Sequence, residues 1–174
     1  MRCDESDGDV RRLSGGVGMK KFLSVILLTL LIICNVGVAQ AMRNETKDIT
    51  KKNLDITDSF YKPMLSGNLN WTKTEYDNCL KAHTELYSYL DKYKPQRNES
   101  GYVIDFLSEN DREVVYHAAT IIALRIHALY DYILALEAHK SGDFNGQNTM
   151  IDACNRDLEY ANDCRQSFTN LYGY

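Results

Sequence analysis

The chain has 174 residues, with 20 lysine and arginine residues against 24 aspartate and glutamate residues, and its formal net charge is −4. A mildly acidic chain without a basic patch is a poor candidate for binding to the phosphate backbone of nucleic acids, because that binding requires clustered lysine and arginine. Only two prolines occur, and this scarcity favours long helices.

Residues 19–41 have the layout of a secretory signal peptide. Lys20 and Lys21 form a short basic region, residues 22–38 are apolar and uncharged, and Ala39-Gln40-Ala41 is a small-x-small cleavage sequence. The apolar run is at the short end of what spans a bilayer. We therefore predict cleavage before Met42 and a secreted, extracellular protein that meets a membrane only through its signal peptide. An uncleaved membrane anchor is the alternative.

Residues 1–18 are polar and unlike the basic start of a signal peptide. We interpret them as a non-native or mis-assigned extension, with Met19 as the initiator. Cleavage would leave residues 42–174, which are enough for one domain with one hydrophobic core. Residues 1–41 hold five basic and four acidic side chains, so residues 42–174 hold 15 and 20, a net charge of −5.

Residues 42–71 carry the weakest helical pattern of the predicted domain. Their apolar residues recur at helix-like spacing and predict a short helix, with the apolar positions Ile49, Leu54, Ile56 and Phe60. Pro63 and Gly67 mark the turn that follows it. We expect a weakly helical segment that precedes the main bundle, which spans residues 72–174.

The next helix is predicted from Thr72 to about Tyr93. Thr72 and Glu75 have the spacing of a capping box at its start. Lys94 precedes Pro95, which disfavours helical geometry and ends the helix. Its apolar stripe has spacings of three and four: Tyr76, Cys79, His83, Leu86 and Leu90. A polar loop over residues 96–101 follows.

The strongest helical pattern begins at Ser108 and ends at Ser141-Gly142, where glycine suits a left-handed cap. Ile126 lies in the middle of its main apolar row, whereas Arg125 is expected to tolerate alanine. Two neighbouring rows make the apolar face broad, the first being Val115, Ala119, Ile122, Ile126, Leu129, Ile133 and Leu136, and the second Val114, Ala118, Ile121, Ala128, Tyr132 and Ala135. Such a face predicts a central helix with neighbours on two sides.

A last helix is predicted from about Asn148 to Leu171. Its apolar stripe consists of Ile151, Cys154, Leu158, Ala161, Phe168 and Leu171. No alternating strand pattern competes with these helices. The predicted fold class is therefore all-α, an antiparallel four-helix bundle that follows a signal peptide.

Cleavage of the signal peptide would leave Cys79, Cys154 and Cys164 as disulfide candidates. Cys154 and Cys164 would lie about 15 Å apart along one unbroken helix, while bridged Cα atoms lie within about 7 Å. A bridge from Cys79 to either of them is therefore favoured. The alternative is that all three are buried thiols.

Three sequons, at Asn44, Asn70 and Asn98, are glycosylation candidates. All three fall outside the segments predicted to be helical, which favours modification in a eukaryotic host. In a bacterial host they would carry no such meaning.

No motif for catalysis, metal binding or cofactor binding rises above background. No two histidines are four residues apart, so paired ligands on a helix are not supported. The acidic cluster of the last helix (Asp152, Asp157, Glu159 and Asp163) fits a solvated surface better than a glycosidase pair. We predict a protein that is not an enzyme. The 12 tyrosines are candidates for a binding surface.

The stretch from Ala138 to Phe168 resembles plant invertase and pectin methylesterase inhibitors. Those proteins carry a long helix ending in Leu-Lys-Ser-Gly-Asp-Tyr and a final Cys followed by an aromatic residue. Residues 140–144 match that turn, Cys164 and Phe168 match the end, and the next helix matches at Asn148, Thr149, Ile151 and Ala153. The family's N-terminal cysteine pair is missing, Ile121 stands near its long-helix cysteine, and Met150 replaces its usual tryptophan.

The resemblance implies a secreted inhibitor that covers the active-site cleft of a carbohydrate-active enzyme in the plant cell wall or vacuole. A protein partner of that class is the leading prediction for function. A secreted helical protein that binds a small apolar ligand, or that acts as a signal, is the alternative. Neither hypothesis requires a cofactor or a metal.

Overall fold

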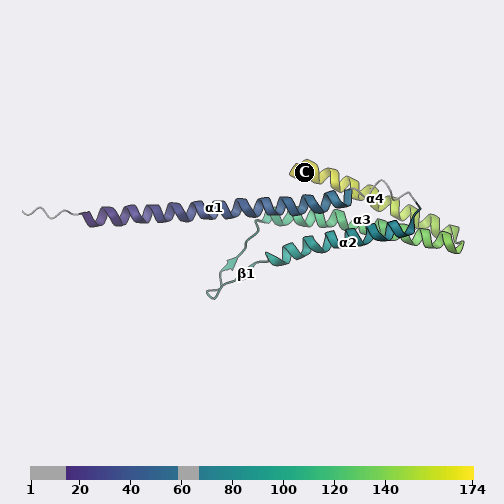
Figure 1. The fold of residues 1–174 in the computed structure, drawn as a ribbon, viewed down its shortest axis with the longest axis horizontal. Coiled ribbons are helices and arrows are strands. Elements are labelled where there is room, and N and C mark those ends of the chain that lie inside the picture. The colour runs from purple at the N-terminus through teal and green to yellow at the C-terminus, as the bar shows by residue number, and fades with distance from the viewer. Residues whose placement is uncertain (1–14, 59–66) are drawn as a thin grey trace, which may run out of the picture. The chain divides into compact units, whose positions relative to one another are not determined.

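The computed structural model describes residues 15–58 and 67–174, and these residues form an all-α fold, as predicted (Figure 1). The chain divides into two compact units, residues 1–40 and 41–174. The described elements are, in chain order, helix α1 (Gly15–Asp58), helix α2 (Leu69–Lys92), strands β1 (Gln96–Arg97) and β2 (Val103–Ile104), helix α3 (Glu109–Ser141) and helix α4 (Phe144–Tyr172).

Helix α1 contains residues of both units. Within residues 15–40 it includes the apolar run of the predicted signal peptide, whose export role stays a prediction. Within residues 41–58 it is longer than the short helix expected there. Phe60 and Pro63, where we expected the helix to end and turn, lie outside the described residues, as does most of the extension before Met19.

Helix α3 is the centre of the second unit because it packs against both α2 and α4. Both predicted rows are buried, with Leu136 partly exposed, so the broad apolar face is confirmed. Ser108 caps its start by accepting a hydrogen bond from the amide of Asp111 at 3.1 Å. Gly142 caps its end with φ of 81°. Helix α3 is also long and apolar enough to cross a membrane, and its packing on two sides identifies it as a core helix.

Helix α2 begins three residues before the predicted capping box. Its N-cap is Asn68, whose side chain accepts from the amide of Trp71 at 3.1 Å. Thr72 and Glu75 are instead buried inside the helix, where the Thr72 hydroxyl donates to the carbonyl of Asn68. The predicted start was wrong because two suitable caps lie four residues apart, and burial of Thr72 decides between them.

Helix α4 also begins earlier than predicted, at Phe144 rather than near Asn148. Asp143 caps it by accepting from the amide of Gly146 at 2.9 Å. Of the predicted stripe, Cys154, Ala161 and Phe168 are buried. Leu171 is 70% exposed, because the helix ends there and the chain turns at Gly173.

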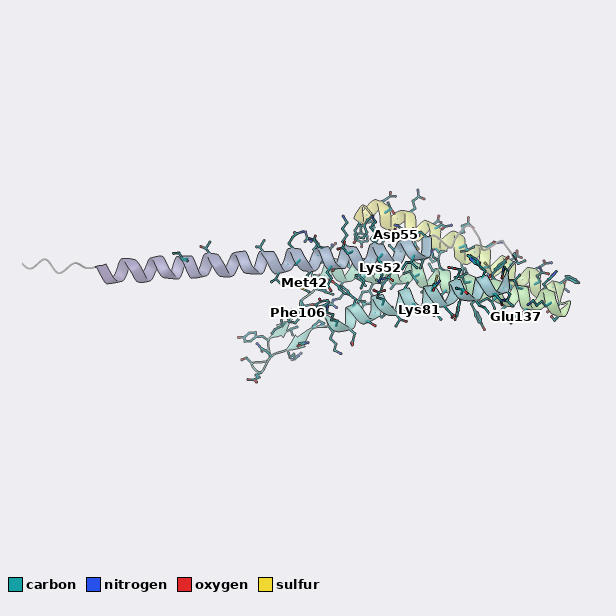
Figure 2. The ribbon with its side chains drawn as sticks, in the orientation of Figure 1. Met42, Lys52, Asp55, Lys81, Phe106 and Glu137 are labelled. Carbon is teal, nitrogen blue, oxygen red and sulfur yellow. The ribbon has the colours of Figure 1, made fainter. Side chains whose placement is uncertain are left out.

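A short hairpin between α2 and α3 replaces the loop that we expected. Its strands are antiparallel, with Gln96 opposite Ile104 and Arg97 opposite Val103. The Asn98 side chain accepts from the amides of Ser100 and Tyr102, which holds the turn. Tyr102 and Phe106 are exposed, and Figure 2 places Phe106 at the hairpin end of the bundle.

Arg125, which we expected to tolerate alanine, is buried, with 5% of its surface exposed. Its guanidinium donates to the hydroxyl of Thr57 and to the carboxylate of Asp58, both at 2.5 Å. Arg165 of α4 donates to the other oxygen of Asp58 at 3.1 Å. One carboxylate at the end of α1 therefore joins α3 and α4.

We expect Arg125→Ala to lower the free energy of unfolding by about 2–3 kcal/mol, because it leaves the Thr57 hydroxyl and Asp58 without their main partner. Urea unfolding followed by circular dichroism measures this. Arg156→Ala, at an exposed position of α4, is the matched control and should change stability by less than about 0.5 kcal/mol. Equal midpoints for the two variants would contradict the buried role of Arg125.

Candidate functional site

A surface of five aromatic side chains and one leucine spans α2 and α3, and we call it the tyrosine face. It consists of Tyr76, Leu80, His83 and Tyr87 from α2 and Tyr116 and Tyr130 from α3. Positions 76, 80, 83 and 87 are spaced by four, three and four, so they share one side of the helix. The predicted apolar stripe of α2 included two of these, Tyr76 and His83, which the structure places at the edge of the core rather than inside it.

Ring contacts join the two helices across this face. Tyr76 and Tyr130 have ring centroids 6.2 Å apart, and Tyr87 and Tyr116 have centroids 6.3 Å apart in an edge-on arrangement. His83 lies 4.7 Å from the ring of Tyr87. Each of the two tyrosine pairs takes one residue from each helix, whereas His83 and Tyr87 both lie on α2. The antiparallel register of α2 and α3 therefore brings together tyrosines that are far apart in the sequence.

The tyrosine face is open to solvent although its rings contact one another. Tyr87, Tyr116 and Tyr130 are 47%, 45% and 51% exposed. Burial lowers the pKa of His83, so its imidazole is neutral near pH 7 and adds no charge to the face. An ion pair between Lys73 and Glu137, at 3.0 Å, joins the same two helices through exposed side chains. Aromatic side chains are enriched at the centres of protein-contact surfaces, and the rims of these surfaces are polar.

The opposite side of α2 contacts α1. Lys52 pairs with Glu85 at 2.7 Å, the hydroxyls of Thr46 and Tyr89 are hydrogen-bonded at 2.8 Å, and Glu45 pairs with Lys92 at 3.1 Å. A helix turns by about 100° per residue, so positions 85, 89 and 92 lie roughly opposite positions 76, 80, 83 and 87. The tyrosine face and the α1 contact are therefore separate surfaces of one helix.

The three disulfide candidates, Cys79, Cys154 and Cys164, are free thiols in the structure, and the predicted bridge from Cys79 is not formed. Burial raises the pKa of Cys79 to about 12 and that of Cys154 to about 11. Arg125 and Glu75 act electrostatically on Cys79, whereas Asp131 and Asp157 act on Cys154. The two thiols thus have different neighbours, and α4 runs unbroken through Cys154 and Cys164, which keeps that pair apart as well.

The three sequons have exposed asparagines, but their local structures differ from the prediction. Asn44 lies inside α1 and Asn70 lies in the first turn of α2, so the expectation that all three avoid helices was wrong for two of them. Asn98 lies in the turn of the hairpin. Its side-chain oxygen is the acceptor described above, which leaves its nitrogen directed away from those bonds.

Groups that could support catalysis are dispersed over the described residues. The acidic residues of α4 lie at exposed or partly exposed positions, as expected for a solvated surface. Sequence reasoning missed Asp131 of α3, whose pKa is raised by burial and by the charge of Asp157. Among residues 15–58 and 67–174, no group of three His, Cys, Asp or Glu side chains has a geometry suited to a metal ion.

Two grooves lie along α3 and α4. One of about 280 Å³ is lined by His117 and Ile121 of α3 and by Cys164, Phe168 and Leu171 of α4, among others. A larger one of about 740 Å³ shares His117 and Leu171 and extends to Arg43 and Lys47 of α1. The hydroxyl of Tyr172 is hydrogen-bonded at 2.8 Å to Nδ1 of His117, a residue that lines both grooves.

The chain matches no protein-family model, and no curated protein or solved structure resembles it closely enough to be called a relative. Its function is therefore inferred from its own residues and surfaces.

In the folded protein of residues 42–174, we expect thiol reagents to distinguish its three cysteines by their rates of reaction. Cys164, which is partly exposed in the groove, should react first, while Cys79 and Cys154 should react only on unfolding because burial suppresses their thiolates. Titration with dithionitrobenzoate, with and without denaturant, measures the two classes. Cys164→Ser should remove the fast reaction. Recovery of a disulfide-bridged peptide that contains Cys79 before reduction would contradict the free-thiol arrangement.

Proposed function

We propose that this protein is a secreted, non-catalytic binding protein that contacts another protein through its tyrosine face. We further propose that the partner is a carbohydrate-active enzyme, an invertase or a pectin methylesterase, whose activity it inhibits. In a plant, the site of action would be the apoplast or the vacuole.

The single observation that carries the binding role is the half-exposed set of tyrosines paired across α2 and α3. Tyrosine offers a large contact area with few rotatable bonds, so ordering it at an interface costs little entropy. Tyrosine is also enriched at the centres of protein interfaces, where single residues carry much of the binding energy. Both helices are held by the buried core of α3, so the face is presented on rigid elements.

The partner class rests on the resemblance to plant invertase and pectin methylesterase inhibitors. In support, residues 140–144 form the tight turn between two long helices that the resemblance implies, with Gly142 in the left-handed conformation. Phe168 is buried in the core, as a recurring structural aromatic would be. The matching segment is structural, so it indicates a class of partner and no contact residues.

A second candidate function is binding of a small apolar ligand, and the groove between α3 and α4 favours it. Ile121, Phe168 and Leu171 supply apolar walls in a space of about 280 Å³. A groove of this size lies at the lower end of small-molecule sites. The tyrosine face lies on α2 and on other positions of α3, so the two functions make different predictions for the same set of variants.

We expect the purified chain to lower the activity of an invertase or a pectin methylesterase from the same source stoichiometrically, with no hydrolytic activity of its own. Tyr87→Ala combined with Tyr116→Ala should weaken the inhibition constant by about 100-fold, because the two rings would lie at the centre of the contact. Titration of the enzyme with each variant measures this.

Tyr160→Ala is the matched control, because Tyr160 is an exposed tyrosine of α4 that lines the groove instead of the tyrosine face. It should leave inhibition unchanged. Loss of inhibition in this variant alone would mean that the enzyme contacts the groove and not the tyrosine face. No effect of the wild-type chain on either enzyme class, in large excess, would refute the inhibitor hypothesis.

A further inference from the structure

Helix α1 packs on the bundle through polar side chains. Of residues 41–58, those that are fully buried are Thr46, Thr50, Asn53, Leu54 and Thr57. The four polar ones are spaced by four, three and four, which is the spacing of core positions in a helical bundle. Leu54 is the one apolar residue among the five. By contrast, α3 buries two full rows of mostly aliphatic side chains.

This contact belongs to the second unit and runs antiparallel to α2. Glu45 of α1 meets Lys92 near the end of α2, and Lys52 meets Glu85 further back. These pairs are 40–59% exposed, and exposed pairs stabilise by about 0–1 kcal/mol each. These exposed ion pairs therefore contribute little to the stability of the contact between α1 and α2.

Two of the buried polar side chains of α1 have no hydrogen-bond partner for an oxygen atom, namely Oγ1 of Thr50 and Oδ1 of Asn53. Two further buried atoms without a partner belong to side chains near Cys79, Oε2 of Glu75 and Nε of Arg125, and Arg125 is itself bonded to α1. A buried polar atom without a partner costs about 1–3 kcal/mol. All four are buried in the second unit, and opening α1 would expose Thr50 and Asn53 to water.

Thr46 differs from Thr50 in this respect. Its hydroxyl donates to the carbonyl of Met42 at 3.0 Å and is hydrogen-bonded to Tyr89 at 2.8 Å. The two threonines lie one turn apart on the same buried side of α1. The two hydroxyls have opposite effects on the packing of α1. The hydrogen bonds of Thr46 stabilise the packed helix, whereas the buried Thr50 hydroxyl without a partner destabilises it.

We propose that residues 42–58 of α1 act as a strap that opens from α2 and α3 as a unit while α2, α3 and α4 stay folded together. The opening relieves the unpartnered atoms of Thr50 and Asn53, and it breaks the Asp58 links to Arg125 and Arg165 last, because these are the least exposed ion pairs of α1. It uncovers Leu54 and the side of α2 that carries Tyr89. It leaves the tyrosine face intact, since that face lies on the opposite side of α2.

Native-state hydrogen exchange of the full chain, read by mass spectrometry of peptides, tests the strap. Amides of residues 46–57 should exchange through a local opening, faster than those of residues 118–133 in α3. Thr50→Val keeps the shape of the side chain and removes its unpartnered oxygen, so it should slow exchange in the strap by roughly fivefold. Thr46→Val removes two hydrogen bonds and should speed exchange by a similar factor. Neither variant should change the exchange of α3.

Equal protection of α1 and α3 in the wild-type chain would overturn the proposal. So would faster strap exchange in Thr50→Val, because it would mean that the Thr50 hydroxyl is stabilised in the closed state. Asn53→Leu removes the other unpartnered oxygen of α1 together with the hydrogen bond that Nδ2 of Asn53 donates to the carbonyl of Ile49 at 2.9 Å, and it should slow strap exchange as well. A failure of the enzyme-inhibition experiment would not affect this result, since the two experiments concern opposite sides of α2.

Discussion

The structure depends on the burial of α3 from two sides. Its two apolar rows are wide enough to pack α2 on one flank and α4 on the other, and most of its aliphatic residues are buried. At roughly 25 cal/mol per Å² of apolar surface, this burial is the main favourable term that a chain of this size has. The turn at Gly142 and the hairpin before Glu109 then fix the directions in which α4 and α2 leave it.

The way in which α1 packs follows from the packing of α3, which already covers the apolar surfaces of α2 and α4. With the apolar surfaces of α2 and α4 packed on α3, the fully buried residues of α1 are threonine, asparagine and one leucine, with Met42 and Ile49 partly buried beside them. Its firmest attachment is electrostatic, through Asp58 between two arginines of different helices. A buried ion pair gives specificity of position at a modest net gain in stability, because desolvation of the charges offsets most of their attraction. A contact of this kind defines where α1 lies without holding it as firmly as the core.

The elements that sequence patterns predicted well are those that depend on local information. The rows of α3, the cap at Ser108 and the left-handed Gly142 all follow from residues within a few turns of one another. Arg125 could not be placed in this way, because its partners Thr57 and Asp58 lie 67–68 residues away. The start of α2 was missed for a related reason, since Asn68 and Thr72 are both good caps and only tertiary burial distinguishes them. The spacing of 76, 80, 83 and 87 was present in the sequence, but the pairing of Tyr87 with Tyr116 requires the register of two helices.

Helix α2 has three different sides, and these keep the rigid tyrosine face apart from the strap of residues 42–58. One side is apolar and packs on α3, one carries Glu85, Tyr89 and Lys92 toward α1, and one carries the tyrosine face. A binding surface loses affinity when its residues must be ordered on contact, so it gains from lying on the pair of helices that share the core. The strap, by contrast, must be able to leave α2, and it can open by itself only if α2 stays folded when it does. The core side of α2 satisfies both requirements, because it fixes α2 to α3 whether or not α1 is in place.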